Sequence, residues 1–112
     1  MLTIEKLNAY GADTKNGLLR CAGNEALYLK LVGICIKDLS ENHLKDALER
    51  NDLNEAFQIA HKLKGGVTNL SLDPVAHPVC ELTELLRNKT PGDYMKLYER
   101  IESETSRLIK LL

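Results

Sequence analysis

Apolar residues recur with the period of an α-helix along almost the whole chain, and this pattern restricts the fold more than any other feature. No segment alternates apolar and polar residues in the way a half-buried strand does. The pattern therefore predicts an all-α protein. Four long amphipathic segments joined by short connections favour an antiparallel four-helix bundle, with short additional helices at the N-terminal end.

Two short helices are predicted before the bundle. The first begins after Thr3, a residue type that caps helix N-termini, and ends before Gly11. The second carries Leu18 and ends at Gly23. Asn24 then has the character of an N-cap, so a long helix is expected to start there.

This long helix is predicted to run without a break for about seven turns, until Asn51-Asp52 ends it. Its expected core face is formed by Leu27, Leu31, Ile34, Cys35, Leu39, Leu44, Ala47 and Leu48.

The next helix is predicted from about Leu53 to Leu70, with a core stripe of Leu53, Ala56, Phe57, Ala60, Leu63, Val67 and Leu70.

Proline is tolerated only in the first turn of a helix. A third bundle helix capped at Asp73 would therefore be irregular at Pro78, so either the chain bends there or the helix starts only near His77. It continues to about Asn88, and Thr90-Pro91 starts the last helix, with Tyr94, Leu97, Tyr98, Ile101, Thr105, Leu108 and Leu111 on one side.

Length and charge exclude several classes of function. The 112 residues correspond to a single domain, 1–112, and the net charge of -1 provides no electrostatic surface for nucleic acid or an anionic membrane. No targeting segment is visible, and the longest apolar run, LVGICI, is too short to span a bilayer. The three cysteines lack any CxxC spacing, which predicts buried reduced thiols and a cytoplasmic protein.

The segment AHKLKGG, from Ala60 to Gly66, is costly for a helix. Two interior glycines sacrifice about 2 kcal/mol relative to alanines. On a helical wheel His61 lies to one side of the core stripe, in a row with Gln58, Gly65 and Thr68. The spacing therefore indicates a surface that must stay empty beside His61.

The residue types in this segment suit one kind of chemistry. A neutral imidazole is a nucleophile at physiological pH. Lys64, one turn further along, supplies a positive charge for an anion, and Gly65 gives a macromolecule close access. The sequence has no glycine-rich loop for ATP and no carboxylate cluster for magnesium. The pattern therefore predicts a site that receives a phosphoryl group from a bulky partner, and not an enzyme with its own kinase activity.

At this point the sequence resembles the histidine-containing phosphotransfer (HPt) family. AHKLKGGVTNLS is similar to the family's Ala-His-x-Leu-Lys-Gly segment followed by Asn-Leu. GLLRCAGNEALYLKLVGICIKDL and DLNEAFQIAHKLKG resemble the stretches that precede the family's histidine, and Leu82, Leu86 and Arg87 stand where its following helix places them.

The resemblance implies a helical fold with a four-helix bundle and a phosphocarrier of a two-component phosphorelay. His61 would take a phosphoryl group from a receiver domain's phospho-aspartate and pass it to another receiver, and Lys64 would stabilise the phosphoryl oxygens. Gln58, Lys62, Gly65 and Thr68 would contact the partner. No cofactor or metal is implied for this chain, since Mg²⁺ is expected only on the receiver. The expected partners are response-regulator receiver domains and a hybrid sensor histidine kinase, and the chain is expected to be a monomer.

Three positions depart from the family pattern. Ser71 stands where a glycine is frequent, and the Pro74/Pro78 pair disturbs the start of the next helix. These differences concern the local shape beside the site rather than the identity of His61. Cys35 stands where the family often has phenylalanine, which concerns packing alone.

Other interpretations stay open at the level of sequence. A helical-bundle adaptor could bind receiver or kinase domains without being phosphorylated. A metal site could be built from His43, His61, His77 and Cys80, but Pro78 interrupts the helical spacing that it needs and His43 lies among charged residues. The chain could also be a domain of a larger sensor kinase, although its starting methionine and final amphipathic helix favour a free-standing protein.

Overall fold

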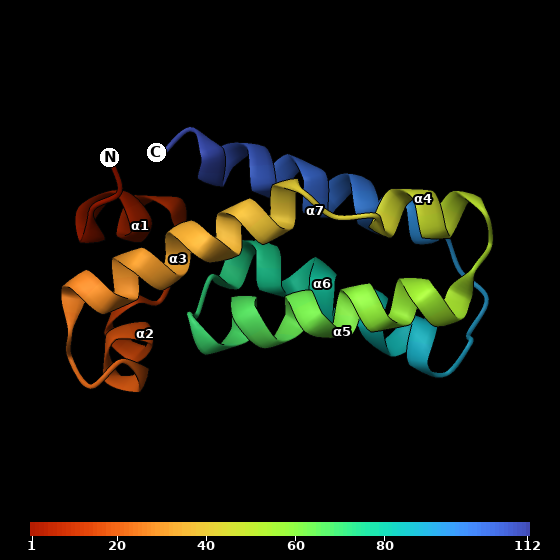
Figure 1. Ribbon diagram of the computed structural model, residues 1–112, viewed down its shortest axis with the longest axis horizontal. Coiled ribbons are helices and arrows are strands. Elements are labelled where there is room, and N and C mark those ends of the chain that lie inside the picture. Colours follow the sequence, from red (N-terminus) through yellow and green to blue (C-terminus); the bar gives the residue numbers. More distant parts are fainter.

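The computed structural model describes residues 1–112 and contains helices joined by turns and short loops. Its elements are α1 (Ile4–Tyr10), α2 (Thr14–Arg20), α3 (Glu25–Ser40), α4 (Leu44–Glu49), α5 (Leu53–Asn69), α6 (Asp73–Arg87) and α7 (Tyr94–Ile109). Helices α3 and α4 follow one another along one side of a bundle, and α5, α6 and α7 form the other three sides (Figure 1). The predicted all-α four-helix bundle with short N-terminal helices is confirmed.

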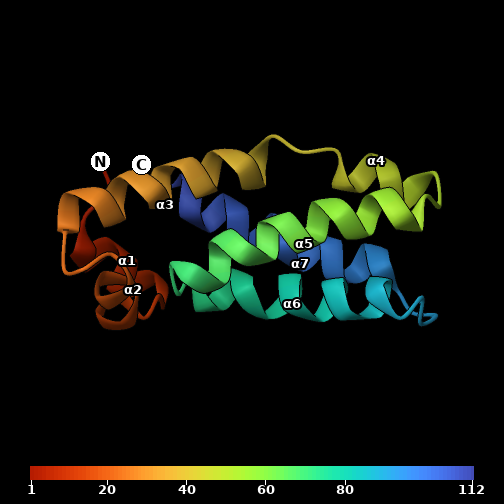
Figure 2. The same ribbon diagram turned by 60° about the horizontal axis from the view of Figure 1, so that its bottom comes forward.

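Successive sides of the bundle run in opposite directions. Helix α5 returns along α3 and α4, α6 reverses again, and α7 brings the chain back to the end where it began (Figures 1 and 2). Helix α6 packs on α5 and α7, while α3 and α4 each contact both α5 and α7. The Met1 amino group donates a hydrogen bond to the Leu112 carbonyl, which ties the two ends of the chain together.

The core is one cluster of 26 buried hydrophobic residues. Helix α5 contributes Ala56, Ala60, Leu63 and Val67, which follow the three- and four-residue spacing of its predicted stripe. No helix of the chain combines the length and the apolar character that crossing a bilayer requires.

Side-chain caps define several of the helix starts as predicted. The Thr3 hydroxyl accepts from the Lys6 amide, and the Asn24 side chain accepts from the Leu27 amide. Gly11 ends α1 in the left-handed region, with φ 112°.

The predicted unbroken helix from Asn24 to Asn51 is wrong, because the chain leaves the helix at residues 41–43. Asn42 accounts for the break. Its Nδ2 donates to the Leu39 carbonyl at 2.8 Å, and its Oδ1 accepts from the Leu44 amide at 3.0 Å. One side chain thus satisfies backbone groups at the end of α3 and at the start of α4, which stabilises the gap between them.

The predicted core face of α3 is also partly wrong. Leu27 and Ile34 are 40% and 49% exposed, and the buried positions are instead Tyr28, Val32 and Ile36, together with Cys35 and Leu39 as predicted. The Tyr28 hydroxyl donates to the Leu70 carbonyl at 2.9 Å, and burial raises the pKa of this phenol to about 12. Because the phenol finds an acceptor inside the bundle, α3 is rotated so that Tyr28 rather than Leu27 faces the core.

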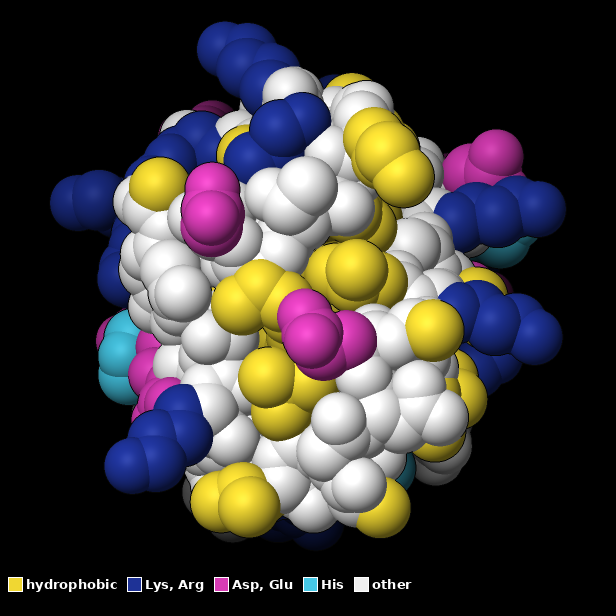
Figure 3. Space-filling view, turned by 90° about the vertical axis from the view of Figure 1, so that its left-hand side faces the viewer, with side chains coloured by type: hydrophobic (Ala, Val, Ile, Leu, Met, Phe, Trp, Pro, Cys, Tyr) yellow, Lys and Arg dark blue, Asp and Glu magenta, His cyan; other side chains and the backbone are white.

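Apolar side chains are exposed at one end of the molecule. Hydrophobic side chains gather in the middle of the end of the molecule formed by α1, α2 and the start of α3 (Figure 3). In these elements Leu19 is 71% exposed and Leu27 is 40% exposed.

Helix α6 begins at Asp73, ahead of both prolines, so the alternative start near His77 is wrong. Pro74 lies in the first turn, where backbone N–H groups make no hydrogen bond within the helix. Its lack of an amide proton therefore costs no hydrogen bond. Pro78 lies in the second turn and is buried, and the helix continues past it to Arg87.

Two further helix starts differ from the prediction. The last helix begins at Tyr94 instead of Thr90-Pro91, because the Asp93 side chain accepts from the Lys96 amide at 3.0 Å and caps it. The second short helix extends back to Thr14, because Asp13 caps it in the same way, and it ends at Arg20, before Gly23.

Ser71 connects α5 and α6 in the left-handed region, with φ 55°. This backbone conformation explains why glycine suits the position. The serine is held there by contacts with the loop before α2 and with α2 itself. Its hydroxyl accepts from Asn16 Nδ2 at 2.7 Å, and its carbonyl accepts from the Asp13 amide at 2.9 Å.

We expect Ser71→Gly to be more stable than Ser71→Ala by about 1 kcal/mol. Both variants lose the hydroxyl bonded to Asn16, but only alanine retains a Cβ in the left-handed region. Urea unfolding of the two variants measures the difference. Equal free energies of unfolding would show that the backbone at this position carries no strain.

Candidate functional site

Helix α5 has a buried side and an exposed side, and the predicted site residues lie on the exposed side. His61 and Gln58 are exposed, Gly65 follows one turn after His61, and Thr68 is half-buried. The Thr68 hydroxyl donates to the Lys64 carbonyl at 2.7 Å, so it is already engaged by its own helix. The exposed row of α5 therefore presents the His61 imidazole as its reactive group.

The two glycines of α5 have different surroundings. A Cβ placed on Gly65 would meet no heavy atom within 4 Å, so this position borders open space. A Cβ placed on Gly66 would lie 3.3 Å from the Sγ of Cys35 on α3. The small size of Gly66 therefore serves packing against a neighbouring helix. The space beside Gly65 adjoins the His61 turn, because side chains of a helix lean over the preceding turn.

The two lysines of the segment point to opposite flanks of His61. Lys64 is half-buried, and its Nζ lies 3.4 Å from Glu84 Oε1 on α6. Lys62 is exposed and lines a groove on the α3 side. The structure therefore places cationic groups on both flanks of the imidazole, with Lys64 paired to a carboxylate.

An aromatic stack supports His61 from the preceding turn. The Phe57 and His61 rings are stacked, with centroids 5.6 Å apart and an interplanar angle of 22°. The Arg87 guanidinium lies over the Phe57 ring, with Cζ 5.1 Å from its centroid. Phe57 was expected in the core stripe but is only half-buried, and its role beside His61 was not predicted. The four-residue spacing of Phe57 and His61 could have indicated this contact, because residues four apart are neighbours on the surface of a helix.

A groove of about 240 Å³ lies between α3 and α5, next to the site. Leu31, Ile34 and Cys35 line it from α3, and Lys62, Leu63, Gly66 and Asn69 line it from α5, together with Asp38 and Leu70. Burial and, to a smaller extent, the nearby Asp38 carboxylate raise the pKa of the Cys35 thiol to about 12, so the thiol remains protonated at neutral pH. The groove is mainly apolar, and Ile34, which lies outside the core, forms part of its wall.

The other candidate ligands are dispersed over the molecule. His43 precedes α4, while His77 and Cys80 lie on α6, and no three His, Cys, Asp or Glu side chains are grouped so that they could hold a metal ion. Cys21 and Cys35 are buried as predicted, Cys80 is half-buried, and all three are free thiols.

The arrangement at α5 suits a nucleophile that acts on a group presented by another macromolecule. The imidazole is exposed, the next turn offers no side chain to obstruct an approach, and cations flank it. An exposed surface of this kind does not enclose a small substrate, which sites for small molecules normally do.

Comparison with known families identifies one match. The family model described as Hpt domain matches residues 31–110, which include the later part of α3 and all of α4, α5, α6 and α7. Comparisons with curated proteins and with solved structures gave no significant match.

We expect glutamine substitutions to separate the two glycines. Gly65→Gln should unfold at the same or higher denaturant concentration, because helix propensity rises by up to about 1 kcal/mol and no neighbour obstructs the side chain. Gly66→Gln must displace Cys35 and should lose about 1–3 kcal/mol through overpacking. Chemical unfolding of both variants tests this, and an equal loss of stability in the two would contradict the assignment.

Proposed function

Since this chain belongs to the Hpt domain family, whose members carry phosphoryl groups in phosphorelays, we propose that it is a histidine phosphocarrier that uses His61 as its acceptor. His61 accepts the phosphoryl group from the phospho-aspartate of one receiver domain and passes it to another. The observation that carries this proposal is the exposed imidazole beside the open surface at Gly65.

The proposed chemistry needs little from this chain besides position and charge. The unprotonated imidazole nitrogen forms a bond to phosphorus as the bond from phosphorus to the aspartate oxygen breaks, and the carboxylate stays on the receiver. Charge spreads over the phosphoryl oxygens in the transition state, where the Lys64 ammonium stabilises it. We assign no cofactor to this chain and place Mg²⁺ on the receiver.

We further propose that the receiver docks over the exposed side of α5 and the groove between α3 and α5. Leu31 and Ile34 offer apolar contact, Lys62 and Gln58 offer polar contact, and Gly65 leaves room for the partner's backbone. A hybrid sensor histidine kinase is a further candidate partner through its receiver domain. The protein is proposed to act as a cytoplasmic monomer without a kinase activity of its own.

We expect a phosphorylated receiver domain to label the wild-type protein and His77→Gln but not His61→Gln. The physical reason is that His61 alone has a cation three residues on and open space four residues on. Radiolabel transfer followed by gel electrophoresis measures the outcome, with labelled ATP and Mg²⁺ alone as a control that should give no incorporation.

Full labelling of His61→Gln would refute the assignment of the acceptor. Receiver binding without labelling of any histidine in the wild type would favour the non-phosphorylated adaptor instead.

We expect Lys64→Ala to slow phosphoryl transfer by about tenfold, because the transferring group loses a positive charge. Its free energy of unfolding should change by no more than about 0.5 kcal/mol, since the ion pair to Glu84 is partly exposed to solvent. Single-turnover transfer kinetics and urea unfolding provide the two measurements. A wild-type transfer rate would show that the lysine is only a surface residue.

A further inference from the structure

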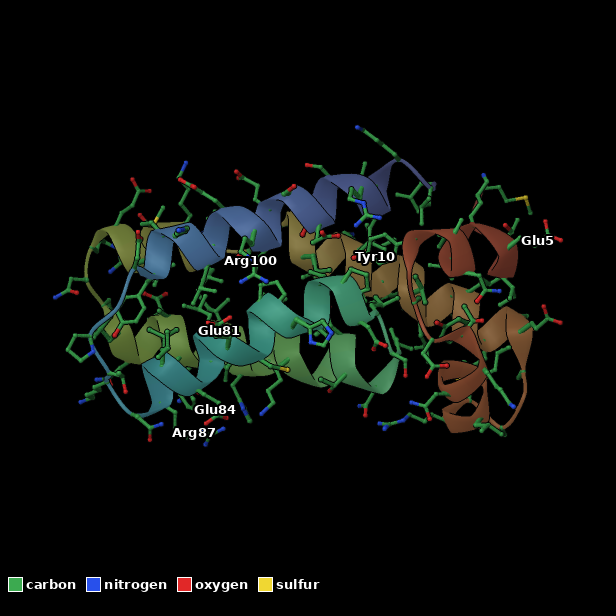
Figure 4. All side chains as sticks on the ribbon, turned by 180° about the vertical axis from the view of Figure 1, so that it is seen from behind. Glu5, Tyr10, Glu81, Glu84, Arg87 and Arg100 are labelled. Atoms are coloured by element: carbon green, nitrogen blue, oxygen red, sulfur yellow. The ribbon has the colours of Figure 1, made fainter.

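Glu84 of α6 lies between two cations of the site. One of its carboxylate oxygens is 3.4 Å from Lys64 Nζ on α5, and the other is 3.3 Å from Arg87 Nε on its own helix. Glu84 and Arg87 occupy the side of α6 away from α7, whereas Glu81 lies on the side that faces Arg100 (Figure 4). A single carboxylate thus bridges the lysine that neighbours His61 and the arginine next to it on α6.

The same carboxylate is connected to His61 through a second set of contacts. Arg87, which Glu84 holds, lies over the Phe57 ring, and Phe57 stacks on His61. Lys64 and Arg87, two of the cations around His61, therefore share Glu84 as their partner in the unphosphorylated protein.

A phosphoryl group on His61 would compete with Glu84 for these cations. A phosphoryl group carries between one and two negative charges near neutral pH and strong acceptor oxygens. The Lys64–Glu84 pair is weak enough to exchange, because its side chains are 31% and 51% exposed and such pairs contribute little to stability. A lysine side chain is flexible and can turn from the carboxylate towards His61.

We propose that Glu84 is a positioning residue that holds Lys64 away from His61 until a phosphoryl group displaces it. The charge on Glu84 thereby opposes phosphorylation, and it sets how far the transfer equilibrium between receiver and His61 favours the phosphorylated protein. This inference rests on the proposed function of His61.

The test is Glu84→Gln in the full chain, mixed with a phosphorylated receiver domain that labels the wild type. Because the neutral amide no longer retains Lys64, the equilibrium should shift towards the phosphorylated chain by about two- to fivefold, the range expected for an exposed ion pair. The partition of radiolabel between the two proteins at equilibrium measures the shift.

Glu81→Gln is the matched control. Glu81 lies one turn earlier on α6 and pairs with Arg100 at the same 3.4 Å distance, with side chains 57% and 54% exposed. The two variants should melt alike, yet Glu81→Gln should leave the transfer equilibrium unchanged. An equal shift in both variants would mean that general surface charge is responsible, and would overturn the proposal.

A double variant tests whether Glu84 acts through Lys64. In a Lys64→Ala background the shift caused by Glu84→Gln should largely disappear, since the residues form one coupled pair. A shift of undiminished size there, or no shift in the single variant while the wild type loads normally, would overturn the role of Glu84. Failure of the wild type to accept label from any receiver would instead refute the proposed function.

Discussion

The burial of one side of α5 against the rest of the bundle is the constraint on which the site depends. Ala56, Ala60, Leu63 and Val67 enter the core at helical spacing, and the geometry of the helix then directs His61 and Gly65 outward. Helix α5 has α3 and α4 on one side and α6 on the other. Different helices therefore border the two flanks of His61. The groove comes from α3, and the partner of Lys64 comes from α6.

The two adjacent glycines have different structural roles. Gly66 allows α3 to approach so closely that Cys35 occupies the space a side chain would take, whereas Gly65 faces no neighbour at all. Two alanines would be better helix formers by about 2 kcal/mol. Glycine at the first position leaves the surface beside His61 open, and glycine at the second allows close contact between helices.

The features that depend on one helix could be predicted from the sequence. The bounds of α5, the caps at Thr3 and Asn24 and the exposure of His61 follow from local periodicity and capping chemistry. The features that depend on contacts between helices could not be predicted from the sequence. The segment LVGICI is apolar on every side of a helix, so its sequence alone does not determine which face is buried. The hydrogen bond from Tyr28 to the Leu70 carbonyl, 42 residues away, turns the Tyr28 side of α3 towards the core.

The same division applies to the site. His61, Lys64 and Gly65 lie within one turn and were predicted together, while Glu84, Arg87 and the groove appear only once α5 is packed against α6 and α3. The break between α3 and α4 is an intermediate case. Asn42 is a residue type that competes for backbone hydrogen bonds, but that tendency alone does not show that it will cap two helices at once.

We propose that His61, on the exposed side of α5, is the single phosphoryl acceptor. Long-range ¹H–¹⁵N and ³¹P spectra of the protein, recorded with a catalytic amount of receiver and a phosphodonor, test it most directly. We expect a phosphorus–nitrogen coupling on the His61 imidazole alone, with shifts of the Lys62, Gly65 and Gly66 amides as the phosphoryl group is attached. A coupling on His43 or His77, with the His61 ring unchanged, would contradict it.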